Sequence, residues 1–256
     1  MERYSRQIIL PGIGKEGQER ILKSKVLVVG LGGLGSSVAY YLAAAGIGML
    51  GIVDYDFVDI TNLNRQILYK EEDLGKSKTE IAKDELKRLN SEIKIIPYHL
   101  RLTKENIGEI FKKYDIIVDC SDNFDTRYLI NDIAVLFSKP FVHGALLGYE
   151  GHVTTIDVKK GPCYRCLFKE PPPSGTTPCC REAGVLGALA GVVGSIQSLE
   201  VFKLVLGIGN PLVGELLTFD VLKSSFRKIN FIKNKNCIAC CKKESNNLFE
   251  GNYIDA

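Results

Sequence analysis

The sequence has 256 residues, 45% of them hydrophobic and 25% charged, which is the balance of a globular protein with a full core. Its 33 basic and 30 acidic residues leave a net charge of +3, too small to favour a nucleic acid or an anionic membrane as a partner. The segment 1–10 carries charge and has no apolar signal region, so we expect a cytoplasmic protein. In that reducing compartment the eight cysteines are expected to be metal ligands or catalysts rather than disulfides.

The first part of the chain alternates apolar, β-branched runs with segments that favour helices. Strands are predicted over 25–30, 49–54, 93–100, 115–120 and 140–145. Helices are predicted over 36–45, 76–90, 103–113 and 127–137. This alternation predicts an α/β fold with a Rossmann-like, doubly wound sheet whose N-terminal strands run parallel.

The pattern changes after Gly151. Residues 152–158 alternate polar and apolar side chains, and two later antiparallel strands are predicted at 215–220 and 225–231. A long loop is predicted over 167–181 and a buried helix over 183–206, because its most apolar stretch is shorter than the roughly 20 residues that span a bilayer. We expect one domain over 1–256 with a mixed sheet and a poorly ordered tail at 242–256.

A glycine-rich turn joins the first predicted strand to the first predicted helix. Gly30, Gly32 and Gly35 fit the pattern G-x-G-x-x-G, which lets a ligand approach the backbone and leaves the first helix amides free for phosphate. Asp54 ends the next predicted strand, where a carboxylate can bind ribose hydroxyls. These four residues predict a nucleotide site, and NAD satisfies them as well as ATP does.

Charged side chains beyond the strand ends favour a triphosphate. Arg65 closes a polar segment over 56–66, Lys78 opens the following helix, and Asp122 follows the strand at 115–120. Arginine and lysine suit phosphate oxygens, and a carboxylate suits Mg²⁺. A nicotinamide enzyme needs none of these groups. The alternative for each one alone is a solvated surface charge, which is the better interpretation of Lys78 by itself, so the combination carries the prediction.

Two cysteine pairs have metal-ligand spacing. Cys163-x-x-Cys166 and Cys237-x-x-Cys240 each put two thiolates on one short loop, which is half of a tetrahedral zinc site. Together they predict a structural zinc that fastens the C-terminal segment to the body of the protein. Two unrelated pairs of free cysteines are the alternative, and whether Cys241 joins the site is left open.

Another cysteine pair lies in the predicted loop before the buried helix. Cys179 and Cys180 come near the start of that helix, where a thiolate has a lowered pKa and is a better nucleophile. An inert loop cysteine is the alternative. The histidines at positions 99, 143 and 152 are predicted to be core or edge residues rather than catalysts.

Several long or rare motifs are spread over nearly the whole chain. They are RYSRQIIL at 3–10, GLGGLG at 30–35, DYDFVDITNLNRQ at 54–66, GKSK at 75–78, DCSDN at 119–123, CYRC at 163–166, CREAG at 180–184 and CIAC at 237–240. Through them the chain resembles the ThiF/MoeB/HesA family, the bacterial and archaeal relatives of ubiquitin-activating enzymes. Together the motifs are far more specific than a lone glycine pattern.

The resemblance implies three cofactors, namely ATP, Mg²⁺ and a structural Zn²⁺ on the two cysteine pairs. The residues implied for the nucleotide lie in the glycine turn and beyond the next strand. They are Gly30, Gly32, Gly33 and Gly35 in the turn, Asp54 at the ribose, Gln66 close by, and Asn62, Arg65 and Lys78 at the phosphates.

The resemblance also implies which residues act in catalysis. They are Asp122, Arg65, Lys78, Arg6 and Cys180. Asp122 would coordinate Mg²⁺ and be the most sensitive position. Arg6 would reach the γ-phosphate of ATP in a partner subunit, which implies a homodimer. Cys180 would take part in sulfur or thioester chemistry, and the adjacent Cys179 leaves that assignment open.

The implied reaction is ATP-dependent adenylation of the C-terminal Gly-Gly carboxylate of a ubiquitin-like sulfur carrier of the ThiS/MoaD kind. Residues 1–150 would bind the nucleotide, and residues 151–241 would form a zinc-stapled carrier-binding part. Sulfur would come from a separate donor protein. The motifs do not choose among carriers for thiamin, molybdopterin or tRNA thiolation.

Three other functions are compatible with parts of the sequence. An NAD-dependent oxidoreductase fits the glycine turn but does not need Arg65, Lys78 or the cysteine pairs. A tRNA-modifying dehydratase of the same superfamily fits the ATP site, whereas the cysteine pairs with CREAG favour the carrier enzyme. A non-catalytic binding protein does not explain the full set of phosphate-binding residues.

Overall fold

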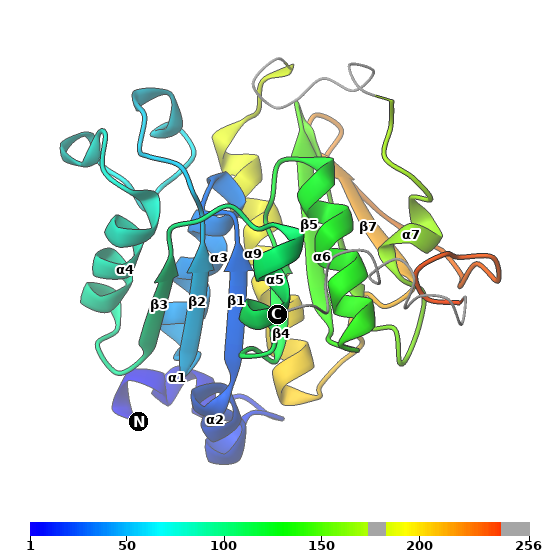
Figure 1. Ribbon diagram of the computed structural model, residues 1–256. Coiled ribbons are helices and arrows are strands. Elements are labelled where there is room, and N and C mark those ends of the chain that lie inside the picture. Colours follow the sequence, from blue (N-terminus) through cyan, green and yellow to red (C-terminus); the bar gives the residue numbers. More distant parts are fainter. Residues whose placement is uncertain (174–182, 242–256) are drawn as a thin grey trace.

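A mixed sheet forms the centre of the fold in the computed structural model, which describes residues 1–173 and 183–241 (Figure 1). The strand order is β3-β2-β1-β4-β5-β6-β7-β8, with parallel pairing up to β5 and antiparallel pairing from β5 onward. The strands are β1 (Lys25–Val29), β2 (Met49–Val53), β3 (Lys94–Tyr98), β4 (Ile116–Asp119), β5 (Phe141–Leu147), β6 (Glu150–Ile156), β7 (Glu215–Asp220) and β8 (Ser225–Asn230). The predicted α/β fold with a parallel N-terminal part and an antiparallel C-terminal part is confirmed.

Helices cover both faces of the parallel strands, and in Figure 1 α5 and α6 lie in front of the sheet while α3 and α9 lie behind it. The larger helices are α2 (Gly14–Lys23), α3 (Gly33–Ala45), α4 (Lys78–Leu89), α5 (Lys104–Phe111), α6 (Phe124–Leu136) and α9 (Gly187–Leu206). The short ones are η1 (Glu2–Tyr4), α1 (Ser5–Ile8), η2 (Ile60–Asn62), η3 (Glu71–Asp73) and α7 (Tyr164–Leu167). Val26 and Val28 belong to one apolar cluster and Leu27 to the other, so the apolar run of β1 is buried on both faces.

Helix α9 is the apolar helix predicted at 183–206, but it begins only at Gly187. An added Cβ on Gly194 would lie 2.8 Å from the carbonyl oxygen of Leu34, so small residues let α9 pack tightly on α3. By length and composition this helix would be able to cross a membrane, yet half of its apolar window is buried within the protein. Its apolar sequence is thus largely explained by packing against α3 and the sheet.

Several helix boundaries differ from the predicted ones. Helix α6 begins at Phe124, three residues earlier than predicted, because Asn123 Oδ1 accepts a hydrogen bond from the Thr126 amide at 2.9 Å. Helix α3 begins at Gly33 rather than at residue 36, and it ends as predicted at Gly46, which has a φ of 91°. The helices between residues 2 and 23 were not predicted. Residues 174–182 and 242–256, which include Cys179, Cys180 and the predicted tail, lie outside the described residues.

Candidate active site

The turn between β1 and α3 leaves the first amides of the helix without side-chain caps. Gly30 has a φ of 90°, and an added Cβ there would lie 2.8 Å from the Cys120 carbonyl oxygen. At Gly35 an added Cβ would lie 1.9 Å from the Gly30 carbonyl oxygen. Gly32 is the N-cap of α3, and an added Cβ there would meet only Gln66 Nε2, at 3.8 Å. The turn therefore presents helix amides to whatever ligand lies above it.

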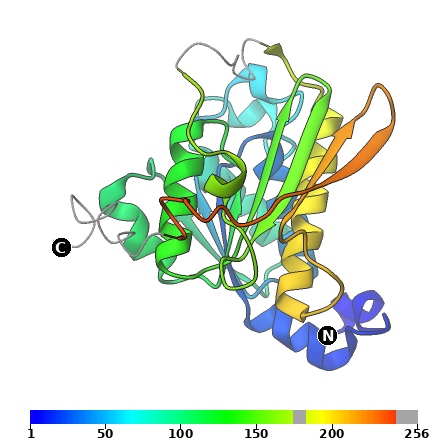
Figure 2. The same cartoon turned by 90° about the vertical axis from the view of Figure 1, so that its right-hand side faces the viewer.

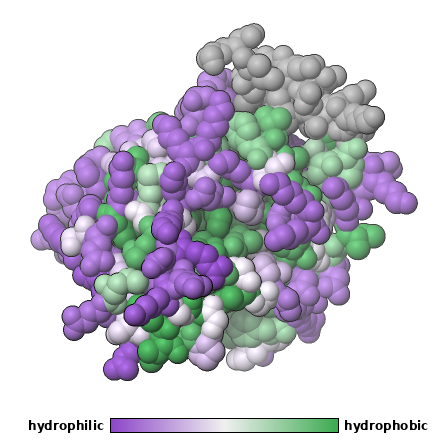
Figure 3. Space-filling view, turned by 90° about the horizontal axis from the view of Figure 1, so that it is seen from below, coloured by the Kyte–Doolittle hydropathy of each residue, from purple (hydrophilic) through white to green (hydrophobic). Residues whose placement is uncertain are grey.

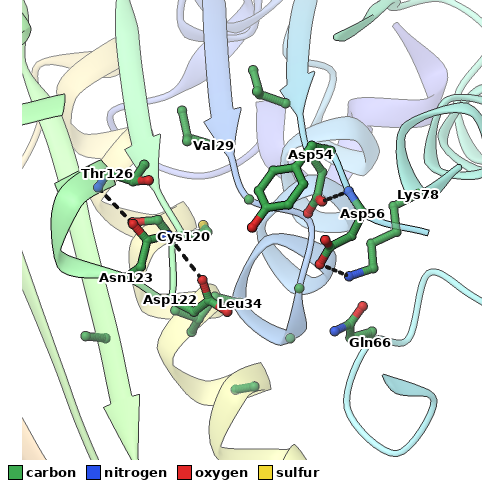
Figure 4. Close-up of a pocket in the computed structure, with 18 of the residues that line it drawn as sticks. Val29, Leu34, Asp54, Asp56, Gln66, Lys78, Cys120, Asp122, Asn123 and Thr126 are labelled. Carbon is green, nitrogen blue, oxygen red and sulfur yellow. Dashed lines mark hydrogen bonds and ion pairs between the residues drawn. The ribbon is translucent and has the colours of Figure 1, made fainter. Parts of the chain in front are cut away.

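A cavity of about 190 Å³ lies over this turn, at the carboxyl ends of the parallel strands. Figure 4 shows Asp54, Asp56 and Lys78 on one side of the turn and Asp122 and Asn123 on the other. Most of the predicted nucleotide residues line this cavity. They are Gly30, Gly32, Gly33, Asp54, Asn62, Arg65, Gln66, Lys78 and Asp122. Of the other predicted residues, Gly35 lies in the turn beneath the cavity, Arg6 lies elsewhere, and Cys180 is outside the described residues.

Asp54 and Lys78 are buried charges on the same side of the cavity. The Asp54 carboxylate accepts hydrogen bonds from the Leu31 amide at 2.7 Å and from the Asp56 amide at 2.8 Å. Burial raises the pKa of Asp54, and the nearby Lys78 charge opposes that rise. The Lys78 side chain is only 5% exposed and lies 3.1 Å from Asp56. Lys78 is therefore no solvated surface charge, because the protein holds its ammonium group at the cavity wall.

The segment around η2 places three further predicted residues. Arg65 Nη1 donates to the Thr61 carbonyl oxygen at 2.8 Å, and no carboxylate in the described part of the chain forms an ion pair with it. The Oε1 atom of Gln66 is buried and accepts no hydrogen bond from the described residues. Asn62 is partly used by the fold, since its Oδ1 accepts from the Asp59 amide at 3.3 Å. An unpaired guanidinium and an unpaired amide oxygen fit a ligand with anionic oxygens and hydrogen-bond donors, as a nucleotide has.

A second cavity of about 680 Å³ adjoins the first and was not predicted from the sequence. The two cavities share Asp122, Asn123, Arg127, Ala145 and Leu146. The other walls come from β6 and β7, from α7 and from Phe168. The sequence gives little sign of this cavity, because its walls meet only when the antiparallel strands fold back beside α6.

A chain of buried polar groups lies under the second cavity. His143 Nδ1 lies 2.7 Å from Asp119 Oδ2, and His143 Nε2 lies 3.3 Å from His152 Nε2. His143 is fully buried, whereas His152 lines the cavity. Burial and the neighbouring His143 and Arg127 lower the pKa of His152 to about 3. His143 is thus a core histidine with a partner, as predicted, and His152 lies neutral at the cavity wall.

The lowered pKa of His152 predicts a loss of stability in mild acid. An unfolded histidine has a pKa of about 6.5, so below that value the unfolded chain binds a proton that the folded chain does not. Above about pH 6.5 His152 is neutral in both states and costs no stability. As the pH falls toward about 3 the protein loses stability, and the loss is about 2 kcal/mol at about pH 5. Urea unfolding of wild type and His152→Gln at about pH 7.5 and about pH 5 should show a smaller pH effect in the variant.

The exposed His99, which contacts Ser77 and Phe57, provides the matched control for this experiment. His99→Gln should keep the pH dependence of the wild type. Equal pH dependence in wild type and His152→Gln would contradict the assignment of a neutral, buried His152.

The two cysteine pairs come together although they are far apart in the sequence. The sulfur atoms of Cys163, Cys166, Cys237 and Cys240 all lie within 4.8 Å of one another, and three of the pairs are 3.5–3.8 Å apart. Four Zn–S bonds of about 2.3 Å in a tetrahedron place the sulfurs about 3.8 Å apart, so the cluster fits zinc. Figure 2 shows the segment after β8 running back across the sheet toward α7. Cys241 lies 3.8 Å from Cys240 but is not part of the four-cysteine group.

Arg6 lies far from both cavities. It is exposed on α1, at the edge of the sheet where the parallel strands begin, whereas the cavities lie where those strands end (Figure 1). Figure 3 views the α1 end of the molecule and shows apolar side chains gathered among charged ones. Large exposed apolar side chains occur directly after α1 and on α3 and α9. They include Ile9, Leu10, Tyr41 and Leu199.

The model of the ThiF family matches residues 4–240 of this chain. A sulfur carrier protein adenylyltransferase of Thermus thermophilus is 50% identical over 245 residues, which are 94% of this chain and 90% of that protein. An adenylyltransferase and sulfurtransferase MOCS3 of Xenopus laevis is 48% identical over 251 residues, or 98% of this chain. The chain spans about half of that longer relative, 56% of its length.

Solved structures show the same fold. A crystal structure of E. coli MccB with ATP has a TM-score of 0.83 and 24% identity, and the match covers 94% of this chain and 75% of that one. A crystal structure of E. coli MccB with AMPCPP and MccA has a TM-score of 0.80 and 26% identity, covering 93% of this chain and 74% of that one.

Proposed function

The chain belongs to the ThiF family, and we propose from this premise that it uses ATP to adenylate the C-terminal carboxylate of a ubiquitin-like sulfur carrier protein. The observation that carries the proposal is the pair of adjoining cavities, one over a glycine turn with cationic walls and one open beside it. Two substrates that react with each other need two such spaces with a common boundary. The matched relatives at 46–50% identity are named adenylyltransferases, which favours this activity over an oxidoreductase or a tRNA-modifying dehydratase.

ATP would occupy the first cavity. Its phosphates would accept hydrogen bonds from the amides at the start of α3, with Arg65 and Lys78 neutralising their charge. Asp54 and Gln66 would contact the nucleoside, and the unpaired Oε1 of Gln66 would accept from a ribose hydroxyl or a base amino group. Asp122 would hold Mg²⁺, which supplies positive charge to the phosphates when it is bound. The MccB structure with AMPCPP and MccA supports a nucleotide and a peptide substrate on this fold.

The carrier tail would enter through the second cavity. An extended chain ending in Gly-Gly would lie between Phe168 and the face that β6 and β7 form together, and its end would reach the boundary at Asp122 and Arg127. There a carboxylate oxygen attacks the α-phosphorus, the bond to the β-phosphate oxygen breaks, and pyrophosphate leaves. An acyl-adenylate remains. The protein's part in this step is to position two anions and to offset their repulsion.

The two halves of the chain would divide these tasks. Residues 1–150 supply most of the first cavity, and residues 151–241 supply most of the second. A zinc ion on the four cysteines would be structural, because four thiolates leave no position for a substrate. Sulfur delivery by a separate donor, the part of Cys180 as a covalent station and a cytoplasmic location stay predictions.

Pyrophosphate exchange tests the proposed activity. Labelled pyrophosphate should enter ATP only when the enzyme, Mg²⁺ and a carrier ending in Gly-Gly are all present. Small proteins with that ending, captured on the purified enzyme, provide the carriers to test. ATP with Mg²⁺ should raise the melting temperature while NAD should not, because ligands stabilise the state that they bind. Stabilisation by NAD alone would contradict the proposal.

A homodimer would explain why Arg6 lies so far from the cavities of its own chain. We expect Arg6→Ala and Asp122→Ala to be inactive alone and to regain about a quarter of the wild-type rate when refolded or co-expressed together. Half of the dimers would then be mixed, and each mixed dimer would have one site with an intact Asp122 and the partner's intact Arg6. Sedimentation confirms whether dimers form. Absence of any regained activity in a mixed dimer would contradict the shared site.

A further inference from the structure

Arg127 is the cation that lines both cavities in the described part of the chain. It lies in the first turn of α6, after the N-cap Asn123. The other cations of the first cavity line only that one. They are Arg65, Lys78 and Arg101. Lys223 and Arg227 line only the second cavity. Arg127 therefore lies where the contents of the two cavities meet.

The guanidinium of Arg127 has donors to spare. Nη2 donates to the Ser121 carbonyl oxygen at 3.3 Å, and the group lies 5.1 Å over the Phe124 ring. Nε is buried and has no acceptor among the described residues. A buried N–H without an acceptor is costly, so native proteins rarely leave one unless a ligand completes it. The Nε atom thus has room for an acceptor that the described residues do not supply.

No carboxylate in the described part of the chain serves as that acceptor. Asp119 is buried, and the Arg127 charge helps to lower its pKa, but its oxygens accept hydrogen bonds from His143 at 2.7 Å and from the Ser121 hydroxyl at 2.6 Å rather than from Arg127. Among the described residues Arg127 forms no ion pair, whereas Lys78 pairs with Asp56 and Lys223 pairs with Asp220. Arg127 thus keeps an unpaired positive charge at the boundary of the two cavities.

We propose that Arg127 binds the terminal carboxylate of the incoming tail and holds it against the α-phosphate. This inference rests on the proposed adenylation and names a substrate-binding residue for it. A planar guanidinium matches a carboxylate with two parallel hydrogen bonds, and it does so without giving up a proton. Attack of one carboxylate oxygen on phosphorus, with loss of pyrophosphate, leaves the guanidinium charged throughout. Its contribution is to reduce the repulsion between the carboxylate and the triphosphate before they react.

The test compares a carrier that has a free C-terminal carboxylate with the same carrier as its C-terminal amide. Their dissociation constants are measured by calorimetry with AMPCPP bound, so that no reaction occurs. Wild type should bind the acid about 10-fold to 100-fold more tightly than the amide, as expected for charge-assisted hydrogen bonds. In Arg127→Gln this ratio should fall to about 3-fold or less, while the affinity for AMPCPP should stay within about 3-fold.

Two further variants make the result specific. Arg227→Gln removes a cation that lines only the second cavity and should keep the acid-to-amide ratio of the wild type. Arg127→Lys keeps the charge without the planar guanidinium and should give an intermediate acid-to-amide ratio. If Arg127→Gln does not fold, the ratio measured for Arg127→Lys tests the inference. A wild-type ratio that persists in the Arg127 variants overturns the inference. A wild-type enzyme that exchanges pyrophosphate but binds acid and amide equally overturns it too, whereas a wild type without carrier-dependent exchange refutes the proposed function itself.

Discussion

We expect carrier-dependent ATP–pyrophosphate exchange to fall by roughly 100-fold to 1,000-fold in Asp122→Ala. Asp122 lies at the common boundary of the two cavities and is exposed to both. Its carboxylate would place Mg²⁺ at the phosphates where attack occurs, so its loss removes charge stabilisation from the reacting centre. Exchange measured at saturating carrier and Mg²⁺ separates this effect from weaker binding, because kcat and not only KM should fall.

A neighbouring acid provides the matched control. Asp125 is exposed in the first turn of α6 and lines neither cavity, so Asp125→Asn should exchange pyrophosphate within about 3-fold of wild type. Asp122→Asn keeps the size of the side chain and should lose nearly as much activity as Asp122→Ala, since an amide is a poorer ligand for Mg²⁺. Wild-type exchange in Asp122→Ala would contradict the role of Asp122 in metal binding.

The second large effect is expected at the four-cysteine cluster. The first cysteine pair is anchored to α6, because Arg165 forms an ion pair with Asp132 at 2.6 Å and the Tyr164 amide donates to Asn131 Oδ1 at 2.9 Å. The second pair follows the last strand, so the metal would tie that segment to α6. We expect Cys237→Ser to lose zinc and to lower the melting temperature by roughly 10 °C or more.

Metal analysis and a neighbouring cysteine make this prediction specific. Purified wild type should contain about one zinc per chain, measured by atomic emission. Cys241→Ser should keep both the zinc and the melting temperature, since Cys241 lies outside the four-cysteine group. A Cys237→Ser variant with full zinc content would show that Cys241 replaces the missing ligand. Wild type without zinc would contradict the structural metal.

Local patterns made the nucleotide cavity predictable from the sequence. A strand, a glycine turn and a helix must place Gly32 and the first helix amides at the sheet edge, and the residues after parallel strands must meet at the same edge. The cysteine pairs were likewise predictable, because their short spacing restricts them to one geometry. The glycine turn and each cysteine pair have in common that a few consecutive residues determine their local geometry.

The second cavity and Arg127 were not predicted, because they depend on contacts between distant segments. Arg127 was predicted only to start a helix, although it lies in the first turn of α6, shortly after Asp122 in the sequence. Its importance becomes visible only when β6 and β7 fold back to form the second cavity beside α6. The burial of Lys78 was not predicted for a similar reason. The other charged side chains of its helix are not among its buried residues, whereas Lys78 is buried and lies beside Asp56 in the folded protein. The antiparallel strands themselves were predicted, but which distant residues they bring beside α6 has no local signal in the sequence.

The unbroken sheet has a consequence for how the enzyme works. Backbone hydrogen bonds run from β4 through β5 and β6 to β7. The strands beside the first cavity and the strands beside the second cavity therefore belong to one continuous sheet. Within the described residues, backbone pairing thus holds the walls of the two cavities in a fixed relation. The carrier's flexible C-terminal tail would therefore have to adapt to the second cavity to align its carboxylate with ATP, and it would lose conformational entropy when it binds there. The length and flexibility of the tail, more than the shape of the carrier's folded domain, should then determine the rate of adenylation.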